Sequence, residues 1–235
     1  MKNNNKAESV VREYLPFTVE LVTDTAMLND AVQVRQSAYA RHLPDVAEGM
    51  ALAEPWDHHE GAVVFLARSK LDGKPVGSMR IHTTETARLP LEQSITLPPA
   101  FSGKLLAEAT RLAVVRDSVG SLVKFALFKA YMRYCEAKGV ASMVITARSP
   151  LDRMYDRLCF VDVGEKGLFI PMAHVGGLPH RVMHLSITDV EAQWIACSHP
   201  LLHFMVRTEH PDIKVLDQLK QLEQVITESS ETSPA

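Results

Sequence analysis

Cysteines, long apolar runs and an excess of either charge are all scarce in this sequence. Its three cysteines, Cys135, Cys159 and Cys197, are widely spaced and follow no metal-ligand pattern. They argue against a disulfide framework and predict buried thiols in a reducing compartment. No stretch approaches the roughly 20 apolar residues of a membrane-spanning helix, and the N-terminal segment lacks the apolar centre of a signal peptide. We therefore expect a cytoplasmic protein without an integral membrane segment, and peripheral contact with a membrane is left open.

The formal net charge is only −3, so no basic field points to a nucleic-acid partner. Hydrophobic residues make up 46% of the 235 residues and charged residues 23%. This composition is typical of a globular protein with one large domain or two small ones. The polar ends, residues 1–13 and 228–235, are expected to be disordered.

Periodicity of the apolar residues predicts alternating strands and helices. Strand patterns cover residues 17–22, 62–69, 74–84, 105–115, 140–147, 168–175 and 181–188, and helical patterns cover 25–42, 122–139, 149–160, 189–197, 200–208 and 212–226. Asp72-Gly73 predicts a hairpin between two of the strands, and Ser149 is the expected N-cap of the helix that follows it. Lys129 is expected on the polar arc of the helix over 122–139. The strand–helix–strand–helix–strand order after residue 105 predicts an α/β fold on a mixed sheet.

The strand over 105–115, LLAEATRLAVV, contains two charges, Glu108 and Arg111. A buried ion pair contributes little to stability because both charges must be desolvated, so the pair is either a tolerated structural feature or part of a reaction. Strand alternation places Glu108 and Thr110 on one face and Arg111 on the other. A direct contact would need a bulge or a splayed strand. Otherwise Arg111 organises the far face, with Asp57 or Glu54 as partner.

The segment after this strand resembles the core of the GNAT acyltransferases. The loop from Arg116 to Gly120 and Ser121 resembles, with altered spacing, the loop that holds the pyrophosphate of an acyl carrier at a helix N-terminus. The sequence MYDRLCF resembles a second GNAT motif through Tyr155, with Cys159 where the family has glycine.

The N-terminal half is similar to a narrower group, the long-chain N-acyl amino acid synthases and the acyl-homoserine-lactone (autoinducer) synthases. Four short motifs carry this resemblance in the same order as in those families. They are Arg35 with Tyr39, Glu54 with Asp57, Gly77 with Arg80, Thr83 and Thr84, and Glu108 with Thr110 and Arg111. The resemblance spans residues 17–187, and the segment after it looks more like the amino acid synthases.

This resemblance implies a GNAT-like domain over 14–188, with a central mixed, partly splayed sheet flanked by helices, and a helical extension over 189–227 packed on it. It also implies amide formation from an acyl thioester and an amine. Glu108 is the candidate base, directly or through a water. Arg111 is its candidate organiser and Tyr155 the candidate acid for the leaving thiol. The amino acid would bind at Arg35, Tyr39, Asp57, Arg80 and Thr110, and the acyl carrier at Arg116, Gly120, Ser121 and Lys124.

The expected co-substrate is acyl carrier protein or CoA carrying the acyl chain, with no metal and no tightly bound cofactor. Two alternatives stay open. One is an autoinducer synthase that uses S-adenosylmethionine, although the aromatic residues usual around its Glu-x-Ser-Arg motif are missing here. The other is an acyl-chain or acyl-carrier binding protein without turnover. For single members of the charged set, a structural salt bridge is the competing interpretation, and for Tyr155 it is packing against the sheet.

Overall fold

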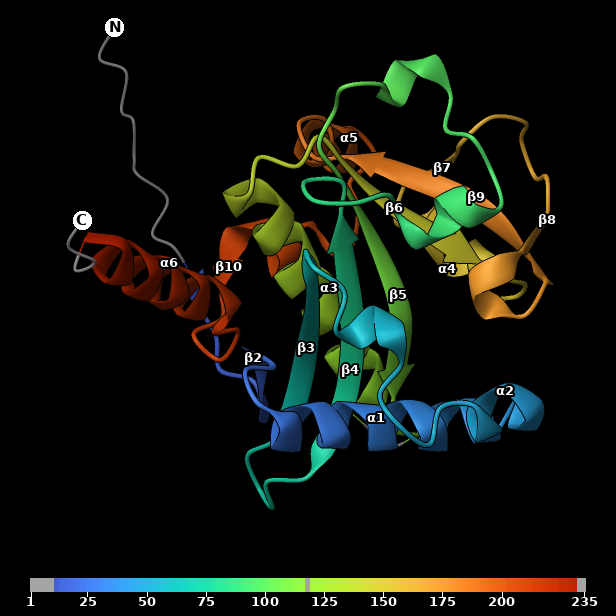
Figure 1. Ribbon diagram of the computed structural model, residues 1–235. Helices are drawn as coiled ribbons and strands as arrows, with labels where there is room; N and C mark the ends of the chain where they lie inside the picture. The colour runs from blue at the N-terminus through green and yellow to red at the C-terminus, as the bar shows by residue number, and fades with distance from the viewer. Residues whose placement is uncertain (1–10, 117–118, 232–235) are drawn as a thin grey trace, which may run out of the picture.

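The computed structural model describes residues 11–116 and 119–231 (Figure 1). Its centre is a sheet of the described strands in the order β2-β3-β4-β5-β6-β9-β7, and β8 pairs with β9. The bounds are β2 Phe17–Leu21, β3 Ala62–Ser69, β4 Pro75–Thr83, β5 Leu106–Val114, β6 Ser142–Ala147, β7 Val161–Asp162, β8 Ile170–Met172 and β9 Leu178–Ser186. The β5–β6 pair is parallel, and the other pairs in this sheet are antiparallel. The predicted α/β class and mixed sheet are confirmed.

Six α-helices and several short turns surround this sheet in the described part of the chain. The α-helices are α1 Thr25–Ala40, α2 Pro44–Glu48, α3 Gly120–Ala137, α4 Asp152–Arg157, α5 Val190–Ala196 and α6 Val215–Glu231. The short turns are η1 Pro55–Asp57, η2 Pro90–Gln93, η3 Pro99–Phe101, η4 Ala173–Val175 and η5 His203–Arg207. Among the described residues, no helix combines the length and apolar character needed to cross a membrane.

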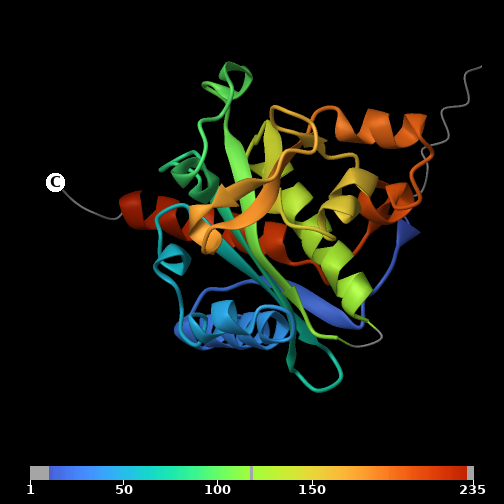
Figure 2. The ribbon, with the colours of Figure 1, turned by 90° about the vertical axis from the view of Figure 1, so that its right-hand side faces the viewer.

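Alternation along the strands sends side chains to two differently covered faces of the sheet. On β3, Phe65 and Ala67 belong to the core that α3 covers, whereas Val64 and Leu66 pack against α1. Figure 2 shows α1 and α3 on opposite faces of the sheet. Gly77 of β4 lets α3 come close, because a Cβ at this position would lie 2.5 Å from Cγ1 of Val123. The α3 face is therefore a tightly packed apolar layer.

β5 and β6 pair over only part of their lengths. Leu106–Ala109 pairs with Ser142–Ile145, and beyond these residues β5 continues beside β4 to Val114 without β6. The two strands separate there (Figure 1). The partly splayed sheet implied by the family resemblance is thus present, and the gap opens directly before the N-terminus of α3.

The C-terminal segment packs along α3 and the β2 edge of the sheet. The side chain of Gln218 on α6 accepts a hydrogen bond from the Leu21 N–H at 2.7 Å, and Lys138 pairs with Glu223 at 2.7 Å. Two stretches expected to be disordered are ordered in part. Residues 11–12 form β1, Val11–Arg12, beside β10, Thr208–Glu209, and residues 228–231 continue α6.

Two local expectations are wrong. Ser149 does not cap a helix, because α4 begins at Asp152, whose N–H bonds to the Arg148 carbonyl. Lys129 is buried rather than on a solvated arc. Its ammonium donates to the Phe204 carbonyl at 2.6 Å and to the Thr208 carbonyl. The C-terminal segment covers this side of α3 and supplies both acceptors.

Candidate active site

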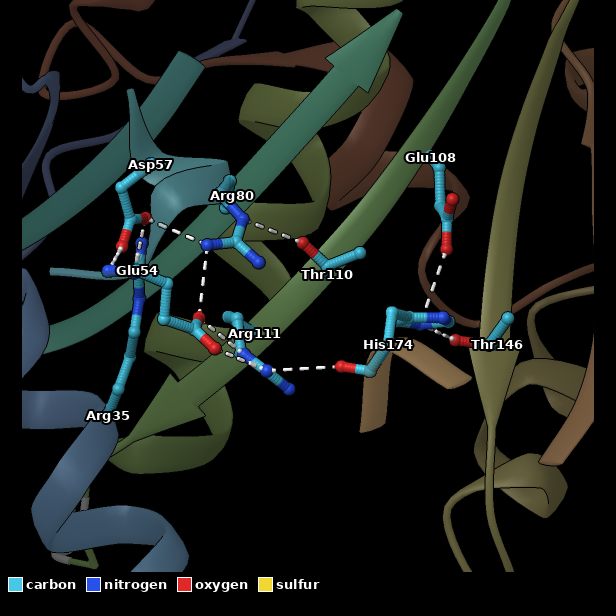
Figure 3. Close-up of polar contacts among 9 residues, drawn as sticks. All are labelled: Arg35, Glu54, Asp57, Arg80, Glu108, Thr110, Arg111, Thr146 and His174. Carbon is cyan, nitrogen blue, oxygen red and sulfur yellow. Dashed lines mark hydrogen bonds and ion pairs between the residues drawn. The ribbon is translucent and has the colours of Figure 1, made fainter. Parts of the chain in front are cut away.

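The face of the sheet opposite α3 carries a group of polar side chains. In the register of β4 and β5, Arg80 lies opposite Thr110 and His82 opposite Glu108. Alternation puts all four on the same face, which is covered by α1 and by the segments containing η1, η2 and η4. Arg80 donates from Nε to the Thr110 hydroxyl at 3.1 Å. Figure 3 shows Arg80, Thr110 and Glu108 together with the side chains that reach this face from α1, from the segment of η1 and from η4.

Three arginines and two carboxylates form a connected network on this face. Arg35 donates to Asp57 Oδ1 at 2.5 Å, and Arg80 donates to the same oxygen and to Glu54 Oε2 at 3.0 Å each. Arg111 completes the network with a two-bond contact to Glu54, from Nε at 2.7 Å and from Nη2 at 2.5 Å. We name these five residues the arginine cluster. Its three guanidiniums outnumber its two carboxylates, which leaves one positive charge unbalanced.

A short turn brings the two carboxylates of the cluster together. η1 follows Glu54 and ends at Asp57, whose carboxylate accepts a hydrogen bond from the Glu54 N–H at 2.8 Å. Burial by itself would raise the pKa of Glu54, but the bonded Arg111 guanidinium brings it below its usual range. Burial likewise acts to raise the pKa of Asp57, and Arg35 and Arg80 lower it. Both carboxylates are therefore ionised at neutral pH.

Arg111 reaches the cluster because β5 bulges at this residue. Its φ of 54° lies in the left-handed region, which non-glycine residues rarely adopt, and the register between β4 and β5 shifts across Ser78/Arg80. The side chain consequently joins the polar face instead of the α3 face that alternation assigns. The expected contact with Glu54 is present, but it lies on the same face as Glu108, so the expectation that Arg111 organises the far face is wrong. In addition, its guanidinium lies over the Tyr39 ring, 5.9 Å from the centroid.

Glu108 is fully enclosed and lies apart from the arginine cluster. Its side chain is 0% exposed, Oε2 accepts a hydrogen bond from the Leu91 N–H at 2.9 Å, and Oε1 lies 3.7 Å from Nε2 of His174. Burial raises the pKa of Glu108 to about 8, although the Leu91 N–H opposes this shift. The carboxyl group therefore carries a proton at neutral pH.

His174 was not among the predicted site residues. It lies in η4, and its Nε2 is 3.4 Å from the Thr146 hydroxyl (Figure 3). Burial, followed by the charge of Arg111, lowers the pKa of His174 to about 4. The glycines at 176 and 177 after it indicate a turn in the sequence, but no local pattern connects this histidine with a carboxylate on β5.

A cavity of about 610 Å³ occupies the gap between β5 and β6. Its size is within the usual range of small-molecule sites. The candidate site residues that line it are Tyr39, Thr110, Arg111, Lys124, Tyr155 and the newly found His174. Arg111 is the only member of the arginine cluster among the lining residues, and Glu108 does not line the cavity. Arg35 and Arg80 are 2% and 1% exposed, so they contact the carboxylates of the cluster on the side away from the cavity.

The residues predicted to bind the acyl carrier lie around the start of α3. Gly120 is the first residue of the helix and is buried, Ser121 is exposed, and Lys124 lines the cavity. Arg116 is exposed just after β5. Asp117 and Ser118, in the middle of the predicted loop, lie outside the described residues.

Tyr155 and Cys159 occupy the end of the GNAT-like segment. Tyr155 is 4% exposed, and burial raises the pKa of its phenol well above the usual value. Cys159 has a φ of 66°, so the position where the family has glycine keeps the backbone conformation that favours glycine. In the described part of the chain, no three His, Cys, Asp or Glu side chains gather in a way that could hold a metal ion.

Comparison with known proteins identifies consistent relatives. The family model described as N-acyl amino acid synthase FeeM matches residues 30–186. The structure of FeeM, an N-acyl amino acid synthase from uncultured soil microbes, shares 15% identity with a TM-score of 0.60 and covers 80% of this chain and 97% of that one. BjaI, a CoA-dependent acyl-homoserine lactone synthase, shares 14% identity with a TM-score of 0.53, over 83% of this chain and 93% of that one. A putative N-acetyltransferase from Lactobacillus plantarum shares 15% identity with a TM-score of 0.52, over 74% and 99%. No curated protein matches the sequence. At such identities the structural likenesses establish the GNAT-like fold.

Proposed function

Since the chain belongs to the FeeM family of N-acyl amino acid synthases, we propose that it transfers a long-chain acyl group from a carrier thioester to the amino group of a free amino acid. The family and the GNAT-like fold make it an N-acyltransferase. The autoinducer synthase alternative fits less well, because the matching family model is that of the amino acid synthases and the lactone synthase BjaI is less similar in structure than FeeM.

The cavity between β5 and β6 is our proposed site for the acyl thioester. It lies at the N-terminus of α3, where backbone N–H groups favour an anion. Three basic side chains line it, namely Arg41 just after α1, Lys124 of α3 and Arg148 just after β6. Such a border suits the phosphates of a carrier arm and the acidic surface of a carrier protein. We propose acyl carrier protein as the donor, and acyl-CoA is the competing donor that the assay below distinguishes.

Arg111 is our proposed contact for the carboxylate of the amino acid. The arginine cluster has one unbalanced positive charge, and Arg111 is its member at the cavity wall. Nε and Nη2 of Arg111 donate to Glu54 and to the His174 carbonyl, so the nitrogen that these bonds leave for a substrate carboxylate is Nη1, whose charge-assisted hydrogen bond is a strong one. Arg35, Asp57 and Arg80 would then act through Glu54, which orients Arg111 by two hydrogen bonds.

Amide formation also requires a base and an acid. An amino acid is mainly an ammonium ion at neutral pH, so a proton must leave before the nitrogen can attack the thioester. We assign this basic role to Glu108, whose pKa of about 8 makes its ionised form a stronger base than an ordinary carboxylate. Tyr155 lines the cavity with a phenol that stays protonated, so it can donate to the departing thiolate.

One observation carries the proposal. One cavity of about 610 Å³ in the splayed sheet is lined by Arg111 of the positively charged arginine cluster, by basic border residues and by a buried tyrosine. The test is to incubate the purified chain with palmitoyl acyl carrier protein, and separately with palmitoyl-CoA, in the presence of the standard amino acids and S-adenosylmethionine. Mass spectrometry then identifies the products.

We expect an N-acyl amino acid, formed faster from the carrier protein. An acyl homoserine lactone would contradict the proposal, and so would an acyl chain that is retained without product. The control is Glu108→Gln, which is close in shape to the protonated carboxyl group. It should leave folding and acyl binding intact while it slows turnover by about 100-fold or more.

A further inference from the structure

We propose that His174 and Glu108 form a proton relay, in which His174 takes a proton from the ammonium group of the amino acid and passes one to Glu108. This inference rests on the proposed function and adds a second catalytic residue to it. Neither the family resemblance nor the sequence motifs contain this histidine.

The cavity separates the two residues into an inner and an outer member. Both side chains are nearly enclosed, with His174 3% and Glu108 0% exposed, but His174 lines the cavity and Glu108 does not. A substrate in the cavity therefore meets the imidazole before the carboxylate. Oε1 of Glu108 has no hydrogen-bond partner among the described residues, and the ring atom that faces it is Nε2 of His174 at 3.7 Å. Catalytic hydrogen bonds are often this long without substrate and shorten when it binds.

The position of His174 is held from several sides. The Arg111 guanidinium donates to the His174 carbonyl at 3.3 Å, and the Ala173 N–H beside it donates to the Ser94 hydroxyl at 2.7 Å. The Thr146 hydroxyl lies 3.4 Å from Nε2. The other ring nitrogen, Nδ1, is buried and has no partner among the described residues, so it can accept a proton from an amine that packs against the ring. Arg111 thus connects the proposed carboxylate site to the backbone of the histidine.

The surroundings of the pair set its protonation. The titratable and charged groups on the same side of the sheet that act on it are Glu54 from the segment before η1, Arg80 and His82 from β4, Glu92 from η2, Arg111 from β5 and His180 from β9, and Tyr131 of α3 lies behind the sheet. Burial raises the pKa of Glu108 to about 8 and lowers that of His174 to about 4. At neutral pH the pair therefore holds one transferable proton on the carboxyl group, and it becomes a competent base when that proton leaves.

The relay moves a proton from the substrate nitrogen to Glu108 in two linked transfers. An N–H bond of the ammonium breaks and its proton goes to Nδ1 of His174, while the proton on Nε2 moves to the ionised Glu108. The freed lone pair of the amine forms the C–N bond at the thioester carbonyl, and the C–S bond breaks when the tetrahedral intermediate collapses. A second proton from the nitrogen leaves with the thiol. The proton on Glu108 returns through His174 to solvent before the next cycle.

The test compares wild type with His174→Gln, Glu108→Gln and His184→Gln. The glutamine at 174 keeps a polar atom near the position of Nε2, so it preserves a structural contact but cannot relay a proton. His184 is a half-buried histidine of β9 that packs against Phe101 and serves as the matched control. Steady-state kinetics with palmitoyl acyl carrier protein are measured from pH 6 to pH 9.5. Nitrogen-15 NMR of the histidine rings, without substrate, follows His174 over the same range, and thermal unfolding confirms folding.

We expect His174→Gln to lower kcat by about 100-fold with KM changed less than about threefold. Wild-type kcat should rise to a plateau above about pH 8, and both the His174→Gln and Glu108→Gln variants should lose this rise. The ring nitrogens of His174 should sense an ionisation in the same range, and Glu108→Gln should abolish it. Wild-type kcat or an unchanged pH rise in His174→Gln, or ring signals that do not respond to Glu108→Gln, would overturn the relay. The failure of wild type to form any acyl amino acid would instead refute the proposed function.

Discussion

Replacing Glu108 by glutamine gives a prediction about stability that needs no substrate. The folded protein holds this carboxyl group in its protonated form, because burial raises its pKa from the ordinary 4.5 to about 8. The unfolded chain, with an ordinary pKa, loses the proton as the pH rises above 4.5. Since the unfolded state then binds fewer protons than the folded state, the wild-type protein loses stability with rising pH. Glutamine does not ionise, so the variant is free of this loss.

The size of the effect follows from the two pKa values. Each pH unit between them changes the free energy of unfolding of wild type by about 1.4 kcal/mol. Between pH 5 and pH 8 the loss relative to Glu108→Gln is thus about 4 kcal/mol. The glutamine side chain can still accept the hydrogen bond that the Leu91 N–H donates to Oε2 at 2.9 Å. We therefore expect the two proteins to be similarly stable at pH 5 and the variant to be more stable at pH 8.

Urea unfolding of both proteins at pH 5, 6, 7 and 8 measures this difference. The control is Glu85→Gln, in which an exposed carboxylate is replaced and the difference from wild type should stay nearly constant with pH. A difference for Glu108→Gln that is equally constant, or that grows as the pH falls, would refute the buried neutral carboxyl group. It would also remove the physical basis for assigning Glu108 as the base.

Two further predictions concern the strands beside the cavity. Arg111→Lys loses the two hydrogen bonds to Glu54 and should raise the KM for the amino acid by about 10- to 100-fold. An unchanged KM would contradict the role of Arg111 as the carboxylate contact. Gly77→Ala places a Cβ 2.5 Å from Val123 Cγ1 and 3.1 Å from Leu127 Cδ1. Urea unfolding should therefore show that the free energy of unfolding falls by about 1–3 kcal/mol. An unchanged free energy of unfolding would mean that α3 moves away from β4 at little cost.

Local sequence patterns predict the parts of this fold whose causes are local. The hairpin at Asp72-Gly73 connects two strands that pair as expected, and the helix predicted over 25–42 is α1, Thr25–Ala40, with Asp24 as N-cap. In these places a turn residue, a cap and an alternating pattern lie within a few positions of one another. The resemblance to the synthases adds the charged residues of the arginine cluster, which the fold brings together from α1, η1, β4 and β5.

Contacts between distant segments are beyond such patterns. Lys129 has the spacing of a solvated helix position, yet it is buried because Phe204, Thr208 and His210, more than 70 positions away, surround its ammonium group. His174 is 66 positions after Glu108 in the numbering, and it reaches Glu108 only because η4 returns over the end of β5 and β6. Neither residue has a local signal that reports its partner.

The bulge at Arg111 explains why two charges three positions apart carry different roles. A left-handed conformation costs a non-glycine residue about 1–3 kcal/mol, and two charge-assisted hydrogen bonds to Glu54 can offset that cost. The consequence for Glu108 is the absence of a guanidinium partner. Glu54, which has that partner, has a lowered pKa, whereas Glu108 has a raised one. A carboxylate bonded to Arg111 would stay ionised at neutral pH and would be a weak base. By directing Arg111 toward Glu54, the bulge leaves Glu108 basic enough to receive the proton that amide formation must remove.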